Sequence, residues 1–348
     1  MSTDPELGSD VQPGCLPPRS RYDLFGHESA EQSLTDGLES GRMHHAWLIT
    51  GPRGVGKATL AWRAARRILG AAASPEYGPL GADPRDPICQ LLEAGACPDL
   101  LVLRRPWDEK RKRWRGEITV DEARRAPHFF EKSASANGGW RVCLVDSVDE
   151  MNTNGANALL KTLEEPPQRG VILLIAHSPG RLPATIRSRC RSLILRPPAI
   201  EITASWLASQ ADGADPDAAR AASRLAGGAP GRALALMASG GVELARRVEA
   251  IVGQGLQAGD SDIRAIAERV SGKGSEGLRS VFFTALSDAV RGQARRAAEQ
   301  QDDPDAWLTA WSEINRLAGE ADALYMDPKQ TALAALGYAR DAARLQNA

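Results

Sequence analysis

The residues whose types and spacing most clearly suggest chemistry lie between positions 51 and 58, which read Gly-Pro-Arg-Gly-Val-Gly-Lys-Ala. Gly51, Gly56 and Lys57 match the pattern of a phosphate-binding loop, with Gly54 inside it. Glycines let backbone N–H groups surround phosphate oxygens, and the lysine adds a full positive charge. The segment therefore predicts a site for the phosphates of a nucleotide. A glycine-rich turn with an exposed lysine is the alternative.

The last position of this phosphate loop departs from the pattern. A Ser or Thr hydroxyl there would bind Mg²⁺, but the residue is Ala58. Thr59 cannot simply replace it, because one step along a helix turns a side chain by about 100°. We expect both positions to line the nucleotide site, with an impaired magnesium contact.

A second set of polar residues follows the apolar segment 142–145. Asp146 ends that segment, where a carboxylate could bridge to Mg²⁺ opposite the phosphate loop; a helix N-cap is the alternative. Many ATPases have a Glu at the next position, but here it is Ser147, which cannot act as a base near neutral pH. Asp149 and Glu150 are expected to begin the next helix. The two departures from the ATPase pattern, Ala58 and Ser147, affect hydrolysis rather than phosphate binding.

Short apolar segments alternate with helical patterns over the first two hundred residues. Buried strands are predicted over residues 46–50, 100–103, 142–145, 171–176 and 192–195. Helices are predicted over residues 29–40, 57–69, 120–132, 150–164 and 182–188, with a loop-like segment over 70–99. This alternation predicts an α/β fold: a parallel sheet with helices on both faces.

The rest of the chain has no strand pattern. Residues 199–240 resemble short helices, and residues 241–348 are rich in Ala, Leu and Arg at helical spacing. The pairs Asp303-Pro304 and Asp327-Pro328 predict helix starts. Residues 1–20 are rich in Pro, Gly, Ser and Asp, which predicts a flexible tail.

The composition excludes several classes of protein. The chain has 348 residues, 43% of them hydrophobic, and a formal net charge of −1, which excludes coating of nucleic acid by bulk charge. No apolar run reaches the roughly 18 residues of a membrane span, and the first twenty residues lack the apolar stretch of a secretory signal. Five scattered cysteines favour reduced thiols. We expect a cytoplasmic protein without a membrane partner.

Residues 104–115 (Arg-Arg-Pro-Trp-Asp-Glu-Lys-Arg-Lys-Arg-Trp-Arg) contain seven basic and two acidic residues. Trp107 and Trp114 are interleaved with the charges. Such a segment could contact nucleic-acid phosphates while the tryptophans stack on bases. A solvated loop is the more common reading of a charge run.

Several motifs resemble those of bacterial clamp-loader AAA+ subunits. Residues 157–167 (Asn-Ala-Leu-Leu-Lys-Thr-Leu-Glu-Glu-Pro-Pro) resemble the helix that follows the acidic strand in that family. Ser188-Arg189-Cys190 carries the family's Ser-Arg-Cys motif. Further similar segments are His45-Ala46, residues 97–100 and residues 225–234. The resemblance runs from about residue 21 to residue 240.

The resemblance implies three domains and a set of partners. It implies an AAA+ P-loop domain over residues 21–198, a small helical lid domain over 199–240 and an all-α oligomerisation collar over 241–348. The implied function is ATP-dependent loading of the sliding clamp onto primed DNA during replication, with ATP or ADP as the ligand. The implied partners are the gamma/tau and delta subunits of DNA polymerase III and, through the complex, the clamp and primed DNA.

The resemblance also implies roles for two arginines. Arg189 corresponds to an arginine finger that acts on the ATP site of a neighbouring subunit, a role that suits a planar, permanently charged guanidinium. A solvated or salt-bridged arginine is the alternative. Arg232 corresponds to an arginine that senses bound nucleotide. His177 and Ser178 stand where that family has a polar sensor, and capping or solvent exposure is the alternative for Ser178.

Two types of subunit within the family remain to be distinguished. The gamma/tau motor type usually has Ser or Thr after the loop lysine, an Asp-Glu pair at the acidic strand and four zinc-binding cysteines. This chain has Ala58, Ser147 and only Cys89 and Cys97 in the corresponding region, so no zinc is expected. It is most similar to the delta-prime class, with little or no hydrolysis of its own. The motor type is the alternative, and an unrelated P-loop kinase or transferase is a third.

Overall fold

The structure is a computed structural model. It describes residue 11 and residues 14–110, 113–135, 139–210, 215–254, 259–272, 274–323 and 326–346. The chain divides into two compact units, which are described separately. Unit 1 comprises residues 1–203 and 227–232, and unit 2 comprises residues 204–226 and 233–348.

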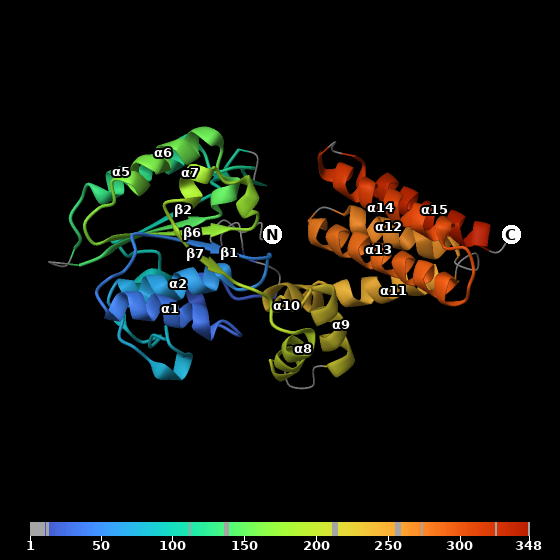
Figure 1. The fold of residues 1–348 in the computed structure, drawn as a ribbon, viewed down its shortest axis with the longest axis horizontal. Coiled ribbons are helices and arrows are strands. Elements are labelled where there is room, and N and C mark those ends of the chain that lie inside the picture. The colour runs from blue at the N-terminus through green and yellow to red at the C-terminus, as the bar shows by residue number, and fades with distance from the viewer. Residues whose placement is uncertain are drawn as a thin grey trace. The chain divides into compact units, whose positions relative to one another are not determined.

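Five parallel strands form the centre of unit 1 (Figure 1). In spatial order they are β2 (Leu100–Arg104), β5 (Arg141–Asp146), β6 (Gly170–Ala176), β1 (Ala46–Thr50) and β7 (Arg191–Ile194). Every residue of β1, β5 and β6 is buried, as expected for parallel strands covered on both faces. The predicted α/β fold with a parallel sheet is confirmed.

Helices cover both faces of this sheet (Figure 1). One face carries α1 (Glu28–Glu39) and α2 (Lys57–Ile68), and the other carries α5 (Arg125–Phe130), α6 (Thr153–Glu164) and α7 (Ala184–Arg187). Two apolar clusters, one on each face, form the core. The single helix predicted over 120–132 is two helices, α4 (Val120–Ala123) and α5. Pro127 has no N–H to bond the carbonyl of Ala123, which favours a break there.

The segment over 70–99 contains more structure than predicted. It includes the 3₁₀ helix η2 (Pro75–Tyr77) and the helix α3 (Pro87–Glu93). The Asp86 carboxylate accepts a hydrogen bond from the N–H of Ile88 at 2.8 Å, and Pro87 occupies the first turn. The prediction of a loop was therefore wrong for α3, although an Asp-Pro pair marks its start.

The basic segment after β2 forms a short antiparallel pair. Its strands are β3 (Trp107–Asp108) and β4 (Arg113–Trp114), while residues 111–112 lie outside the described residues. The two tryptophan rings pack edge to face, with centroids 5.3 Å apart and planes at 74°. The segment is thus a small hairpin held by an aromatic pair rather than an open loop.

From residue 200 onward, the described part of the chain contains helices and no strand. These are α8 (Ile200–Ser209), α9 (Pro216–Leu225), α10 (Pro230–Ala238), α11 (Gly241–Gln254), α12 (Asp260–Ser271), α13 (Glu276–Glu299), α14 (Asp305–Ala323) and α15 (Pro328–Gln346). One apolar core in unit 2 includes residues from both predicted segments, 199–240 and 241–348. The division into lid and collar stays a prediction.

The predicted tail is described only in part. Residues 1–10, 12 and 13 lie outside the described residues, whereas residues 18–20 form the 3₁₀ helix η1 (Pro18–Ser20). The guanidinium of Arg66 in α2 donates to the carbonyl oxygens of Arg19 and Arg21, which fastens this segment to unit 1. Among the described helices, none has the length and apolar character needed to cross a membrane.

Candidate nucleotide site

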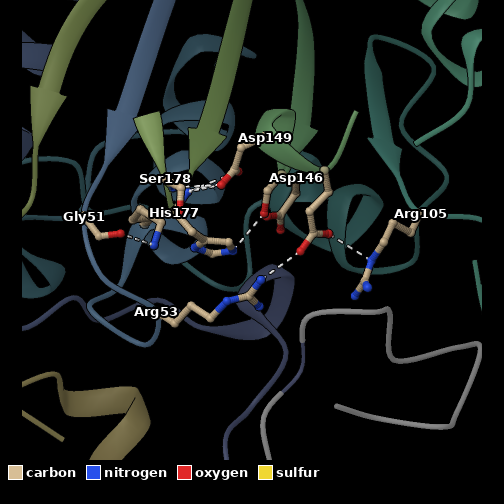
Figure 2. A network of polar contacts seen from close by, with 10 residues as sticks. Gly51, Arg53, Arg105, Asp146, Asp149, His177 and Ser178 are labelled. Atoms are coloured by element: carbon tan, nitrogen blue, oxygen red, sulfur yellow. Dashed lines mark hydrogen bonds and ion pairs between the residues drawn. The ribbon is translucent and has the colours of Figure 1, made fainter. Parts of the chain in front are cut away.

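The carboxyl ends of neighbouring strands bring the predicted site residues together. The parallel register pairs Thr50 of β1 with Ala176 of β6, and Ile175 of β6 with Asp146 of β5. The segments that follow these three strands therefore leave the sheet at the same edge, where ligands of open parallel sheets bind. Figure 2 shows their side chains converging there.

The phosphate loop needs glycine at two positions for steric reasons. Gly51 and Gly54 have φ of 146° and 77°, which side chains rarely adopt. A Cβ on Gly51 would lie 2.4 Å from the carbonyl oxygen of Leu195, and one on Gly54 would lie 2.4 Å from the backbone nitrogen of Arg232. The backbone of the loop is thus packed tightly, without room for side chains.

Lys57 lies inside the loop and is 3% exposed. Its Nζ donates to the carbonyl oxygen of Gly51 at 2.8 Å (Figure 2) and to that of Pro52 at 2.8 Å. Burial lowers the pKa of Lys57 to about 8, and the nearby carboxylate of Asp146 opposes that shift. A phosphate would compete with the two carbonyls for this ammonium group.

The start of α2 also fits a phosphate. Its N-cap is Gly56, and no side chain caps the helix, so its first N–H groups are available to an anion. Magnesium fits less well, because Ala58 supplies no oxygen and Asp146 is 7% exposed. Thr59 follows on the helix and is half-buried.

The described residues hold no group of three or more His, Cys, Asp or Glu side chains arranged to bind a metal ion. Cys89 is buried in α3 and Cys97 is half-buried. Burial raises the pKa of both thiols, which keeps them protonated and makes them poor metal ligands. The expectation that the chain binds no zinc stays a prediction.

Ser147 occupies the position after the acidic residue of β5 and is fully buried. Its hydroxyl Oγ lies 2.8 Å from Nε2 of His177 and 3.4 Å from Oδ1 of Asp146. A serine held in this way offers no basic group to activate water. The helix-cap alternative for Asp146 finds no support at α6, since that helix is capped by Asn152, whose side chain accepts from the N–H of Gly155.

Asp149 does not begin the α-helix predicted over residues 150–164, so that prediction was wrong. It lies in the 3₁₀ helix η3 (Val148–Glu150), and α6 starts only at Thr153. The Asp149 carboxylate accepts hydrogen bonds from the backbone N–H of His177 at 3.1 Å and of Ser178 at 2.8 Å (Figure 2). It therefore fixes the turn that follows β6, a role that the sequence did not indicate. The Ser178 side chain is exposed.

His177 lies among cations and stays neutral at physiological pH. Burial, followed by the charges of Lys57 and Arg53, lowers its pKa to about 3, and Asp149 only partly opposes this. Its Nε2 contacts the Ser147 hydroxyl. His177, which was predicted to be a sensor, is thus hydrogen-bonded to the residue that follows Asp146. Its role in sensing nucleotide stays a prediction.

Glu150 joins the phosphate loop to the turn after β2. Its Oε1 lies 2.9 Å from Nη2 of Arg53, and its Oε2 lies 2.9 Å from Nε of Arg105. Figure 2 shows the two guanidinium groups approaching one carboxylate from opposite sides. The partners are far apart in the sequence, so no local pattern could have predicted this bridge.

Arg232 lies next to the phosphate loop. The N–H of Gly231 donates to the carbonyl oxygen of Gly54 at 2.8 Å, and the Arg232 backbone packs against the same glycine. Burial lowers the pKa of the Arg232 guanidinium. Arg232 therefore lies beside the phosphate loop, while its role in sensing bound nucleotide stays a prediction.

Arg189 follows α7 on the surface of unit 1. Ile186 and Cys190, on either side of it, pack against the core, and burial raises the pKa of the Cys190 thiol to about 12. The Arg189 guanidinium donates to the carbonyl of Thr185 at 2.9 Å and pairs with Glu164 at 2.8 Å. Its side chain is 35% exposed. This ion pair links the Ser-Arg-Cys motif to the residue 157–167 motif.

The parallel sheet with helices on both faces and the helices beyond residue 200 have the architecture of an AAA+ protein. A family model described as "DNA polymerase III, delta subunit" matches residues 26–199. The chain belongs to this family of clamp-loader subunits, so the resemblance is confirmed. Family membership also removes the alternative of an unrelated kinase or transferase.

Relatives of both subunit types are similar to the chain. It is 37% identical over 201 residues to DNA polymerase III subunit delta' of Pseudomonas aeruginosa, covering 58% of each chain. It is 35% identical over 183 residues to subunit tau of Escherichia coli, covering 51% of this chain and 26% of tau. The chain thus matches the first of these relatives over 58% of that relative's length. A solved gamma subunit-related protein from Thermotoga maritima has a TM-score of 0.44 and 16% identity, covering 91% of this chain and 99% of that chain.

Proposed function

We propose that this chain is a delta-prime-type subunit of the DNA polymerase III clamp loader. In this proposal it supports ATP-dependent loading of the sliding clamp onto primed DNA in the cytoplasm. Its partners are the gamma/tau and delta subunits, with the clamp and primed DNA contacted through the complex. Its family and its similarity to subunits named delta' support this assignment.

The observation that carries the proposal is the contrast between the two halves of the site. The phosphate loop retains its glycines and Lys57, and α2 offers uncapped N–H groups. At the position of a catalytic base, Ser147 is buried and bonded to a neutral histidine, and Ala58 lacks the hydroxyl for Mg²⁺. Such a site would bind ATP or ADP, with Lys57 near the outer phosphates, and hydrolyse it poorly.

Arg189 is the side chain that this chain would contribute to the ATP site of a neighbouring subunit. Its ion pair with Glu164 is partly exposed to solvent, so it contributes about 0–1 kcal/mol and can be exchanged. A phosphate would accept two parallel hydrogen bonds from the guanidinium. An arginine supplied across a subunit boundary raises phosphate hydrolysis by about 10³–10⁵-fold.

The test is Arg189→Ala in a complex reconstituted with gamma/tau and delta subunits. We expect ATP turnover at the neighbouring site to fall about 10³-fold or more, while the unfolding midpoint of the variant chain is unchanged. Arg187→Ala is the matched control, because Arg187 is exposed on the same segment. Wild-type turnover with Arg189→Ala, or equal losses with both variants, would contradict the finger assignment.

The gamma/tau motor type is the second candidate, favoured by the 35% identity to tau. It predicts that the purified chain hydrolyses ATP and that Lys57→Ala abolishes this turnover. The delta-prime proposal predicts turnover at background level for the chain alone, with or without the substitution. Nucleotide binding is measured on the same samples. It distinguishes a phosphate loop that binds no nucleotide from one that binds nucleotide without hydrolysing it.

A further inference from the structure

A pocket lies along β2, the edge strand of the sheet in unit 1. Its volume is about 450 Å³, within the range of pockets that bind small ligands. Its floor includes apolar side chains of β2 and Trp62 of α2, and the hairpin of β3 and β4 forms one wall. We refer to it as the β2-edge pocket. No residue of the phosphate loop lines it.

Two indole rings define the wall of the β2-edge pocket. Trp107 and Trp114 are both half-buried, so each ring keeps part of its surface open to the pocket. Nε1 of Trp107 is buried and has no hydrogen-bond partner among the described residues. Because this donor is closed off from solvent, a ligand in the pocket would meet the ring carbons of the two indoles rather than the N–H group.

The charged side chains of the pocket are mostly cationic. Four arginines and one carboxylate line it: Arg19, Arg104, Arg105, Arg125 and Glu122. Glu122 is already paired with Arg125 at 2.6 Å, and the Arg104 guanidinium lies 5.7 Å from the ring centroid of Trp114. A ligand that brings both a flat ring and negative charge would match this lining.

We propose that the β2-edge pocket binds single-stranded nucleic acid. One unpaired base packs against the indole rings of Trp107 and Trp114, and neighbouring phosphates contact Arg104 and Arg125. Any base can stack on an aromatic ring, so the site distinguishes single-stranded from double-stranded nucleic acid but not one base sequence from another. A peptide strand could instead pair with the free edge of β2, but it would not use the excess of positive charge. This inference does not depend on nucleotide hydrolysis or on the role of Arg189.

The experiment titrates the full chain into a fluorescently labelled oligothymidylate and follows anisotropy at several salt concentrations. Trp114→Ala is expected to raise the Kd about 5- to 150-fold, and Trp114→Phe should retain most of the affinity. Arg104→Gln should weaken binding and reduce the slope of log K against log salt by about 0.7, the value for one phosphate contact on a single strand.

Matched controls come from unit 2. Trp311→Ala removes a tryptophan of α14 that is 38% exposed, and Arg295→Gln removes an exposed arginine of α13. Both should bind the oligonucleotide with wild-type affinity. Thermal unfolding of each variant shows whether its fold is intact. If Trp114→Ala loosens the hairpin, Arg104→Gln still tests the binding site.

Three results would overturn the proposal. The first is wild-type affinity in Trp114→Ala and Arg104→Gln, and the second is an equal loss in the control variants. The third is an absence of oligonucleotide binding even at low salt, which would leave strand pairing at the β2 edge as the better use of the pocket. A blunt duplex should compete more weakly than an unlabelled single strand of equal charge, because its bases are not free to stack.

Discussion

At the residue scale, the segment after β5 illustrates how neighbours rather than residue type decide a role. Ser147 and His177 are hydrogen-bonded at 2.8 Å where an ATPase of this class would hold a basic group. Nδ1 of His177 is buried without a partner among the described residues. Burial disfavours the charged form of this ring, and its protonation would also place a third cation beside Lys57 and Arg53, so the neutral form is favoured.

The stability of the chain should therefore depend on His177 below neutral pH. Its pKa is about 3 in the folded protein, lowered by burial and by Lys57, Arg53 and Arg105 against Asp149, whereas its ordinary value is 6.5. The unfolded chain takes up a proton from about pH 6.5 downward and the folded chain does not, so stability falls as the pH drops. His177 should account for a loss of about 2 kcal/mol between pH 7 and pH 5.

Urea unfolding of His177→Gln at pH 7 and pH 5 measures that contribution. The substitution should remove about 2 kcal/mol of the acid-induced loss. His128→Gln is the control, because the His128 side chain is 78% exposed and pairs with the exposed Glu131. An unaltered pH dependence in His177→Gln would mean that this ring already accepts a proton in the folded state.

At the scale of elements, the parts predictable from the sequence are those with strong local signals. β1, β5 and β6 are buried on both faces and mostly apolar, so each was predicted to within one residue at either end. The phosphate loop was predictable because its glycines and Lys57 follow a strand and begin a helix. The bridges through Asp149 and Glu150 were not, because their partners lie 28 and 97 positions away.

The packing of the phosphate loop leads to a prediction about Gly54. A Cβ there would meet the backbone nitrogen of Arg232 at 2.4 Å, and the residue has φ of 77°. Gly54→Ala should therefore lower the unfolding free energy by about 1–3 kcal/mol from backbone strain alone. It should also weaken binding of ADP, since the loop must shift away from Gly231 and Arg232.

Denaturant unfolding and ADP titration test this prediction together. Gly180→Ala is the matched control, since a Cβ at Gly180 meets no atom within 4 Å. That variant should unfold and bind ADP as the wild type does. Equal midpoints for Gly54→Ala and the wild type would show that the loop can move away from Arg232 at no cost.

At the scale of the whole molecule, the two units are built on different cores. Unit 1 has apolar clusters on the two faces of its sheet, to which Leu, Ile and Val side chains of the strands contribute. Unit 2 has one cluster that continues through its helices and contains many alanines. Small side chains let helices approach closely, so each large residue in that cluster fills space that no neighbour can replace.

Phe282 of α13 is such a residue, since it is fully buried in the core of unit 2. Phe282→Ala should cost about 3–5 kcal/mol, because it leaves a cavity as well as removing apolar contact. With separate cores, this cost should be confined to unit 2. Amide hydrogen exchange of the full chain should therefore accelerate in α13 and α14 but remain slow in β5 and β6.

Leu144→Ala supplies the reciprocal test, because Leu144 is fully buried in β5. It should accelerate exchange in β5 and β6 and leave α13 protected. If either substitution released protection in both units together, the chain would unfold as one cooperative body. The separate cores would then be a feature of packing alone, and a destabilised unit 2 would also weaken the nucleotide site of unit 1.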